Sequence, residues 1–190
     1  MSQVIALFGG TFDPIHLGHT GIAQAVSELD CIERVEFIPC HIPAHRDSPN
    51  ATSAERLAML KLAINDNPAF SINPYEIGHE KPSITIDTVT HMRETYPDQH
   101  FAWVMGNDSW QHFTDWDDWQ QILDQIHLIV VNRPGYTLAH PDLLAQHVVH
   151  DSEALSEFDA KKIFVMDDIH LPHSATAIRN KHDVPFEALD

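Results

Sequence analysis

The chain has 190 residues, of which 43% are hydrophobic and 21% charged, a balance that predicts a single globular domain over residues 1–190 with one sizeable core. Its formal net charge of -17 argues against a nucleic-acid surface, because phosphate backbones repel such a field, but a small phosphorylated ligand needs only a local positive pocket. No apolar run approaches the roughly 18–20 residues that span a bilayer, and the N-terminus lacks the basic start of a signal peptide. We therefore expect a cytoplasmic protein without a membrane partner, in which Cys31 and Cys40 are reduced thiols.

The predicted elements alternate between strands and helices along the chain. In chain order they are a strand over Val4–Phe8, a helix over Leu17–Leu29, a strand over Val35–Ile38, a helix over Thr52–Asn65, a strand over Phe70–Ile72 and a helix over Ile84–Tyr96. They continue with a strand over Phe101–Met105, a helix over Asp117–Asp124, a strand over His127–Val131, a strand over Ile163–Met166 and a short helix over Ser174–Asn180. The ends rest on local signals: Gly9-Gly10 stops the first strand, Thr52 and Glu55 make a capping box, and Pro97 closes a helix.

This alternation predicts an α/β fold, a Rossmann-like doubly wound and mostly parallel sheet with helices on both faces. In such sheets a ligand lies at the carboxyl ends of the strands, near the point where the strand order reverses. The segments that follow the strands are therefore the place to search for a site.

The segment after the first strand reads Gly9-Gly10-Thr11-Phe12-Asp13-Pro14. Two glycines let a backbone approach a ligand closely, and the next helix turns its positive N-terminus toward the same place. Neither the Walker phosphate loop nor the GxGxxG dinucleotide fingerprint occurs in the chain. The segment thus predicts a phosphate site of another kind.

Two histidines, His16 and His19, lie three positions apart at the start of the helix that follows. At this spacing both rings share one helix face and can point into one pocket. Two surface or packing histidines are one alternative, and a metal-binding pair is another, although the sequence offers no obvious third ligand nearby.

The segment Gly9–His19 resembles the signature of the HxGH nucleotidyltransferase superfamily, which includes phosphopantetheine adenylyltransferases, cytidylyltransferases and nicotinate or nicotinamide mononucleotide adenylyltransferases. Ser174–Arg179 is similar to the second motif of that superfamily. Four further segments resemble bacterial nicotinate mononucleotide adenylyltransferases, in the right order along the chain. They are Pro39–Arg46, Pro82–Thr85, Gly106–Trp116 and His127–Tyr136.

The resemblance implies an ATP-using enzyme that adenylylates nicotinate mononucleotide, giving deamido-NAD and pyrophosphate. It assigns His16, His19 and Arg179 to the ATP phosphates as catalytic residues. It also implies that Mg²⁺ arrives with ATP and that the protein supplies no dedicated metal ligands. The residues implied to bind the rest of ATP are Phe8, Gly9, Gly10, Thr11, Gly106, Asp108, Ser174 and Thr176. Asp108 is assigned to a ribose hydroxyl, and its alternative is a helix N-cap.

For the acceptor, the resemblance makes Trp116 the stacking surface for the pyridine ring, with Trp110 and Trp119 as competitors and Trp103 in the core. Thr85 is assigned to the nicotinate carboxylate. The phosphate of the mononucleotide falls to His45, Arg46 and Arg133.

Two departures from the family pattern stand out. Only residues 180–190 follow the second motif, where the family usually continues with a longer helical tail. The short tail affects the contacts expected in a homodimer. Asp115, Asp117 and Asp118 surround Trp116, and if they faced the ring they would repel a nicotinate carboxylate. That crowding favours the amide, nicotinamide mononucleotide, as the alternative acceptor.

Three other functions remain open at this level. They are phosphopantetheine or cytidylyl transfer, a non-catalytic nucleotide-binding protein, and a histidine-based metal binder.

Overall fold

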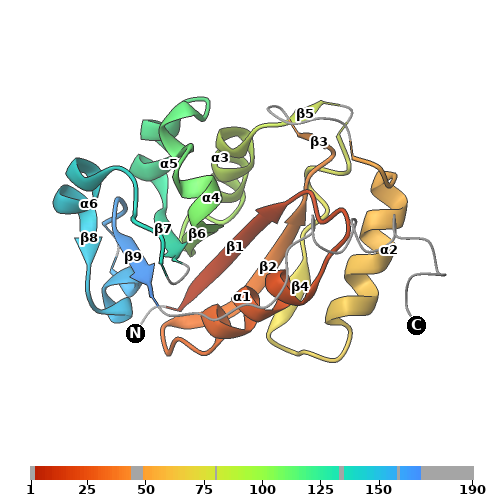
Figure 1. Ribbon diagram of the computed structural model, residues 1–190, viewed down its shortest axis with the longest axis horizontal. Helices are drawn as coiled ribbons and strands as arrows, with labels where there is room; N and C mark the ends of the chain where they lie inside the picture. The colour runs from red at the N-terminus through yellow and green to blue at the C-terminus, as the bar shows by residue number, and fades with distance from the viewer. Residues whose placement is uncertain (1–2, 44–48, 80, 133–134, 158, 168–190) are drawn as a thin grey trace.

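A computed structural model describes residues 3–43, 49–79, 81–132, 135–157 and 159–167. It shows a seven-stranded sheet with helices packed on both faces (Figure 1). The strands of this sheet are β1 (Val4–Gly10), β2 (Ile32–Pro39), β4 (Phe70–Ile72), β6 (His100–Gly106), β7 (His127–Val131), β8 (Val148–Val149) and β9 (Ile163–Met166). A separate two-stranded ladder is formed by β3 (Ile42–Pro43) and β5 (Pro82–Ser83).

The main sheet has the strand order β4-β2-β1-β6-β7-β9-β8, and each of its strand pairs is parallel. The chain builds outward from β1 in one direction through β2 and β4, then returns to the other side of β1 with β6, β7 and β9. The order therefore reverses between β1 and β6, which makes their carboxyl ends the expected ligand crevice. The predicted doubly wound fold is confirmed.

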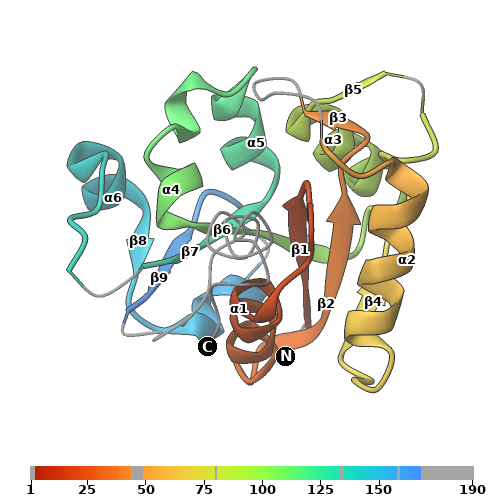
Figure 2. The ribbon, with the colours of Figure 1, turned by 45° about the vertical axis from the view of Figure 1, so that its right-hand side comes forward.

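Helices cover the two faces of the sheet as two distinct layers (Figures 1 and 2). The helices are α1 (Leu17–Ser27), α2 (Ser53–Ile64), α3 (Thr85–Thr95), α4 (Asn107–Trp110), α5 (Trp119–Gln125) and α6 (Pro141–His147), with 3-10 turns η1 (Phe113–Asp115) and η2 (Ser152–Ser156). One core cluster joins α1, α2 and η2 to the sheet, and the other joins α3, α4 and α5 to its opposite face.

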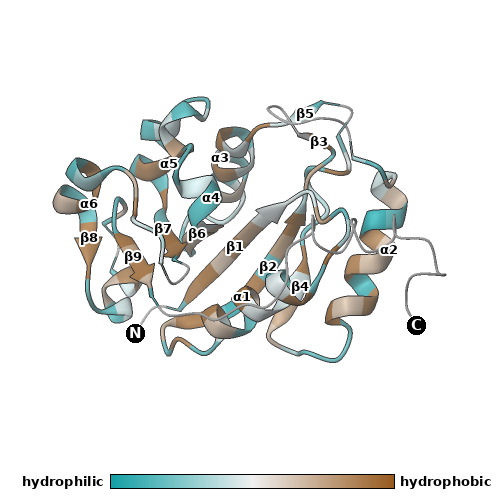
Figure 3. Cartoon of the chain, in the orientation of Figure 1, coloured by the Kyte–Doolittle hydropathy of each residue, from teal (hydrophilic) through white to brown (hydrophobic). Residues whose placement is uncertain are grey.

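The central strands β1, β6 and β7 read as nearly continuous apolar runs because both of their faces are buried. In β1, Val4, Ala6 and Phe8 enter the first core cluster, while Ile5 and Leu7 enter the second. Figure 3 shows hydrophobic residues along the sheet and more polar ones on the outer turns of the helices. A parallel sheet covered on both faces requires this composition.

Most predicted strands and helices are confirmed, with ends shifted by a few residues. The predicted stop of the first strand at Gly9-Gly10 is wrong. Its pairing with β6 ends at Phe8, but its pairing with β2 continues to Gly10, opposite Pro39. The glycines are thus the last residues of a strand that has already separated from one neighbour.

Several short elements were not predicted, namely α4, α6, β3, β5 and β8. They are held by their surroundings rather than by a strong local pattern, as short segments usually are. The predicted capping box is confirmed at the start of α2, where Thr52 and Glu55 bond reciprocally. α5 begins at Trp119 rather than Asp117, because Asp118 has a left-handed backbone at φ 50°. The predicted Ser174–Asn180 helix lies outside the described residues.

Two further observations concern the chain as a whole. Among the described helices, none combines the length and the apolar character needed to cross a membrane. Cys31 and Cys40 are buried free thiols, and burial raises the pKa of each.

Candidate functional site

The carboxyl ends of the parallel strands meet at one edge of the sheet. The register pairs Gly10 with Pro39, and it pairs Val131 with both Gly106 and Met166. The predicted strand-end segments are therefore neighbours in space, although they are spread over most of the sequence.

Gly9 and Gly10 make room for aromatic rings of the protein itself. A Cβ atom on Gly9 would lie 2.3 Å from the indole ring of Trp103, and one on Gly10 would lie 2.9 Å from the ring of Phe12. Both distances are shorter than real Cβ contacts, so neither position accepts a side chain without displacing a buried ring. From the sequence, the glycines were predicted only to let a ligand approach, and this packing role was not predicted.

His16 and His19 lie together at the N-terminus of α1, as predicted. Their rings stack with centroids 3.8 Å apart and an interplanar angle of 28°. His16 is the N-cap residue of α1, and its Nδ1 accepts a hydrogen bond from the backbone N–H of Gly18 at 3.1 Å. A neutral ring that accepts at Nδ1 carries its proton on Nε2, which makes Nε2 a donor for an anionic oxygen.

The ring of His19 is held from its other side by the aromatic core. It makes an edge contact with Phe12, with centroids 5.1 Å apart, and a longer one with Phe8 at 6.2 Å. The two histidines are thus oriented by a helix cap on one side and by packed rings on the other. Such an arrangement can present two imidazoles to a polyanion without first having to order them.

Asp108 follows β6 in the first turn of the four-residue helix α4, with its side chain exposed. The N-cap of this helix is Gly106, so the alternative interpretation of Asp108 as an N-cap is wrong. Next to it, Asn107 is buried, and within the described residues its Oδ1 has no hydrogen-bond partner. This buried amide was missed because an asparagine after a strand usually belongs to a solvated turn.

The four tryptophans have clearly different environments. Trp103 is buried in β6 as predicted, and Trp110 is fully buried with its Nε1 donating to the carbonyl of Ala139 at 3.0 Å. Trp110 is therefore excluded as a stacking surface for a ligand. Trp116 and Trp119 are both partly exposed and both contact Phe113 edge-on, at 5.6 and 5.7 Å.

The acidic residues around Trp116 are on the solvent side. Asp115, Asp117 and Asp118 are all exposed, so solvent screens their charges. Repulsion of a nicotinate carboxylate would require these side chains to face the ring of Trp116, so their exposure gives less support to the amide as acceptor.

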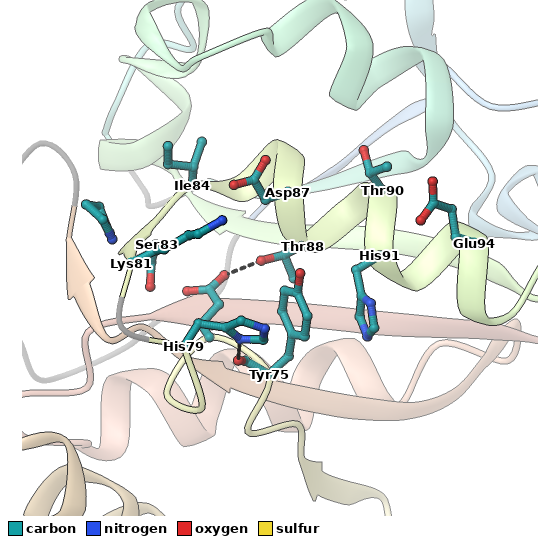
Figure 4. A pocket seen from close by; sticks show the side chains of 12 residues that line it. Tyr75, His79, Lys81, Ser83, Ile84, Asp87, Thr88, Thr90, His91 and Glu94 are labelled. Atoms are coloured by element: carbon teal, nitrogen blue, oxygen red, sulfur yellow. Dashed lines mark hydrogen bonds between the residues drawn. The ribbon is translucent and has the colours of Figure 1, made fainter.

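Thr85 is the first residue of α3, and a polar cavity of about 370 Å³ lies beside this helix (Figure 4). Its walls come from α3 and from the segment around Tyr75–Ser83. Glu76 is buried at this wall and accepts a hydrogen bond from the hydroxyl of Thr88 at 2.6 Å (Figure 4). Burial raises the pKa of the Glu76 carboxyl, and the hydroxyl of Thr88 opposes that rise.

Arg56 was not predicted as a site residue, although its side chain is only 1% exposed and lies at the site. Its guanidinium donates to the carbonyl of Thr11 at 2.6 Å and to that of His41 at 2.9 Å. The available signal was its register, because Arg56 falls on the same face of α2 as the buried Leu60 and Ile64.

Six predicted site residues lie outside the described part of the chain: His45, Arg46, Arg133, Ser174, Thr176 and Arg179. Among the described residues, no group of three or more His, Cys, Asp or Glu side chains is arranged to hold a metal ion. The described site therefore consists of the glycine loop, the stacked histidines and the segments that follow β2, β5 and β6.

Comparison with known proteins places this site in a family. The cytidylyltransferase-like family model matches residues 7–181. The nicotinate-nucleotide adenylyltransferase of Salmonella typhimurium is 40% identical over 187 residues, covering 95% of this chain and 88% of the relative. A probable nicotinate-nucleotide adenylyltransferase of Aeromonas salmonicida is also 40% identical, over 92% of this chain and 84% of its own length. This chain belongs to the nicotinate-nucleotide adenylyltransferase family.

Solved structures agree at the level of the fold. A Plasmodium falciparum nicotinic acid mononucleotide adenylyltransferase complexed with NaAD has a TM-score of 0.74 at 18% identity, covering 94% of this chain and 83% of that one. The same protein complexed with APC has a TM-score of 0.71. Membership of the nicotinate-nucleotide adenylyltransferase family confirms the resemblance inferred from the segments Gly9–His19 and Pro39–Arg46 and makes the chain a nucleotidyltransferase.

Proposed function

We propose that this chain transfers the adenylyl group of ATP to nicotinate mononucleotide, forming deamido-NAD and pyrophosphate. Family membership over nearly the whole chain supports the reaction. The observation that carries the proposal is the stacked pair His16 and His19 at the N-terminus of α1, next to the end of β1. A helix N-terminus with two imidazole donors suits the polyphosphate of a nucleotide.

The proposed reaction is an in-line displacement at the α-phosphorus of ATP. The 5′-phosphate of the mononucleotide has a second pKa near 6, so it is largely dianionic at neutral pH and needs no protein base. One of its oxygens forms a bond to the α-phosphorus, while the bond from that phosphorus to the bridging oxygen breaks and pyrophosphate departs. The task of the protein is to align two polyanions and to stabilise the charge that develops between them.

On the ATP side, His16 and His19 donate to phosphate oxygens, and His19 faces the α-phosphate where charge develops. The loop residues Phe8, Gly9, Gly10 and Thr11 line the nucleotide groove. Gly106 and Asp108 lie at the ribose, where the exposed carboxylate accepts a hydrogen bond from a ribose hydroxyl. Ser174, Thr176 and Arg179 hold the departing pyrophosphate. Mg²⁺ enters with ATP as part of the substrate and neutralises its phosphates.

On the acceptor side, Trp116 stacks on the pyridine ring, and its partial exposure beside Phe113 supports this role. Trp119 has a similar environment and is the competitor. Thr85, at the first turn of α3, receives the nicotinate carboxylate, and His45, Arg46 and Arg133 receive the phosphate. We also propose a cytoplasmic location and a homodimer, and light scattering of the purified chain tests the oligomeric state.

The decisive experiment measures pyrophosphate release from ATP with nicotinate mononucleotide and with nicotinamide mononucleotide, with the dinucleotide product identified by mass. We expect a kcat/KM at least about tenfold higher for the acid, a difference of about 1.4 kcal/mol in transition-state binding. A higher value with the amide overturns the acid preference. Activity only with phosphopantetheine or CTP, or binding of ATP without pyrophosphate release from any acceptor, overturns the proposed reaction.

A further inference from the structure

Arg56 is a buried cation whose N–H groups donate hydrogen bonds to neutral oxygens. Besides the carbonyls of Thr11 and His41, the guanidinium donates to the hydroxyl of Ser53 at 3.1 Å and to the carbonyl of Ala51 at 3.3 Å. Within the described part of the chain, no carboxylate forms an ion pair with it. Burying a charged group costs free energy unless its hydrogen-bonding groups are satisfied. The hydrogen bonds of Arg56 therefore fix the positions of the backbone carbonyls that they join.

The two short bonds of Arg56 reach two different segments of the site. Thr11 belongs to the glycine loop after β1, which is proposed to bind ATP. His41 lies just after β2, at the start of the small ladder in which Ile42 pairs with Pro82. One guanidinium therefore bridges the loop proposed for ATP and the segment that leads to the acceptor.

The link continues from His41 into the acceptor segment. The backbone N–H of His41 donates to the hydroxyl of Ser83 at 2.8 Å, and Ser83 lies two residues before Thr85. Ser83 and the buried Glu76 line the same cavity, and the carboxylate of Glu76 accepts a hydrogen bond from Thr88 in α3. A series of hydrogen bonds thus runs from Thr11 through Arg56 and His41 to Ser83, next to the start of α3.

A second set of hydrogen bonds holds the same loop at Asp13. The carboxylate of Asp13 accepts from the backbone N–H groups of Asn50 at 2.8 Å and Ala51 at 3.1 Å. The carbonyl of Ala51 also accepts a hydrogen bond from Arg56, so both sets of hydrogen bonds reach the segment just before α2. Arg56 lies at the point where these bonds converge.

We propose that Arg56 is a positioning residue that sets the spacing between the ATP loop and the acceptor segment. The inference rests on the proposed function, because only a two-substrate transfer requires that spacing. Arg56 acts through Thr11 and His41 rather than by contact with a substrate. In-line attack needs reacting atoms about 3–3.5 Å apart, and a misplacement of about 1 Å costs roughly a hundredfold in rate.

The role requires the planar fork of arginine and not only its charge. Lysine keeps the positive charge but is a single point donor on a flexible stem, so it cannot hold two carbonyls at fixed separation. Glutamine removes the charge and most of the donors. Arg56→Lys and Arg56→Gln therefore separate alignment from electrostatics.

The test compares these variants with Arg93→Lys and Arg93→Gln. Arg93 is a matched control, since it is half-buried and its Nη1 also donates to a carbonyl, that of Gln99, at the far end of α3. With both substrates saturating, we expect kcat to fall at least about tenfold in both Arg56 variants, with wild-type kcat in both Arg93 variants. The dissociation constant of a non-hydrolysable ATP analogue, measured alone by calorimetry, should change by less than about threefold in the Arg56→Lys variant, because the loop still binds one substrate.

A second measurement does not depend on activity. Amide hydrogen exchange should rise together in residues 9–13 and 40–43 of Arg56→Lys, and in neither segment of Arg93→Lys. An unchanged kcat in Arg56→Gln, or faster exchange in only one segment, overturns the positioning role. If the wild-type chain fails to use any pyridine mononucleotide while both segments still exchange faster together, the proposed function fails and the link between the segments stands.

Should the Arg56 variants fail to fold by circular dichroism, Ser53→Ala provides the test. This variant removes the Ser53 hydroxyl, which accepts from Arg56 and also contacts Nδ1 of His41 at 3.1 Å. The guanidinium of Arg56 stays in place. We expect a smaller fall in kcat, about threefold, with unchanged affinity for the ATP analogue. Wild-type kcat in this variant, together with unchanged exchange in residues 9–13, overturns the proposal.

Discussion

At the scale of single residues, the stacked histidines give the sharpest expectation. His19→Ala should lower kcat by roughly 10²–10³-fold, because it removes a preorganised donor from the place where charge develops. The KM values of both substrates should change little. Initial rates of pyrophosphate release check the prediction, and wild-type turnover in this variant would show that the proposed assignment of His19 is wrong.

Trp116→Ala is the contrasting variant. It removes a stacking surface that binds the ground state and the transition state alike, so it should mainly raise the KM of the mononucleotide and leave kcat near wild type. Trp119→Ala serves as its control, since Trp119 contacts the same Phe113 and is also partly exposed. A larger effect at Trp119 would transfer the stacking role to that residue.

At the scale of elements, the approach of the end of β1 to Trp103 on β6 explains why Gly9 has no side chain. Gly9→Ala should destabilise the fold by about 1–3 kcal/mol, the usual cost of overpacking, because the added Cβ meets the buried indole at 2.3 Å. Gly106→Ala is the matched control, since a Cβ there has nothing within 4 Å. Urea unfolding of the two variants measures the difference, and equal stabilities would contradict the packing argument.

At the scale of the whole molecule, His127 couples stability to pH. Burial lowers the pKa of His127 from 6.5 to about 4, so between these values the unfolded chain binds a proton that the folded chain does not. Its contribution to stability is therefore complete above about pH 6.5 and is lost as the pH falls toward 4. The loss is about 3 kcal/mol for the full interval.

The free energy of unfolding of His127→Leu, measured by urea titration between pH 4 and 7, should show a smaller slope with pH than that of the wild-type chain. Part of the slope should remain, because burial also lowers the pKa of His100. His150→Gln, at an exposed histidine, should keep the wild-type slope. An unchanged slope in His127→Leu would contradict the assignment.

What the sequence determined by itself is the order of the main elements, the parallel sheet and the family. Continuous apolar runs such as His127–Val131 can be recognised locally, because burial on both faces leaves no alternation. The segment Gly9–His19 is likewise recognised from adjacent residues, and the three-residue spacing of His16 and His19 was enough to predict that they lie together.

What only the tertiary structure decided are the contacts between residues far apart in the chain. Gly9 faces Trp103, the indole of Trp110 donates to the carbonyl of Ala139, and Arg56 joins Thr11 to His41. The physical reason is that packing and hydrogen bonding select partners by distance in space. A local pattern records that a position is buried, but not which carbonyl or ring it will meet.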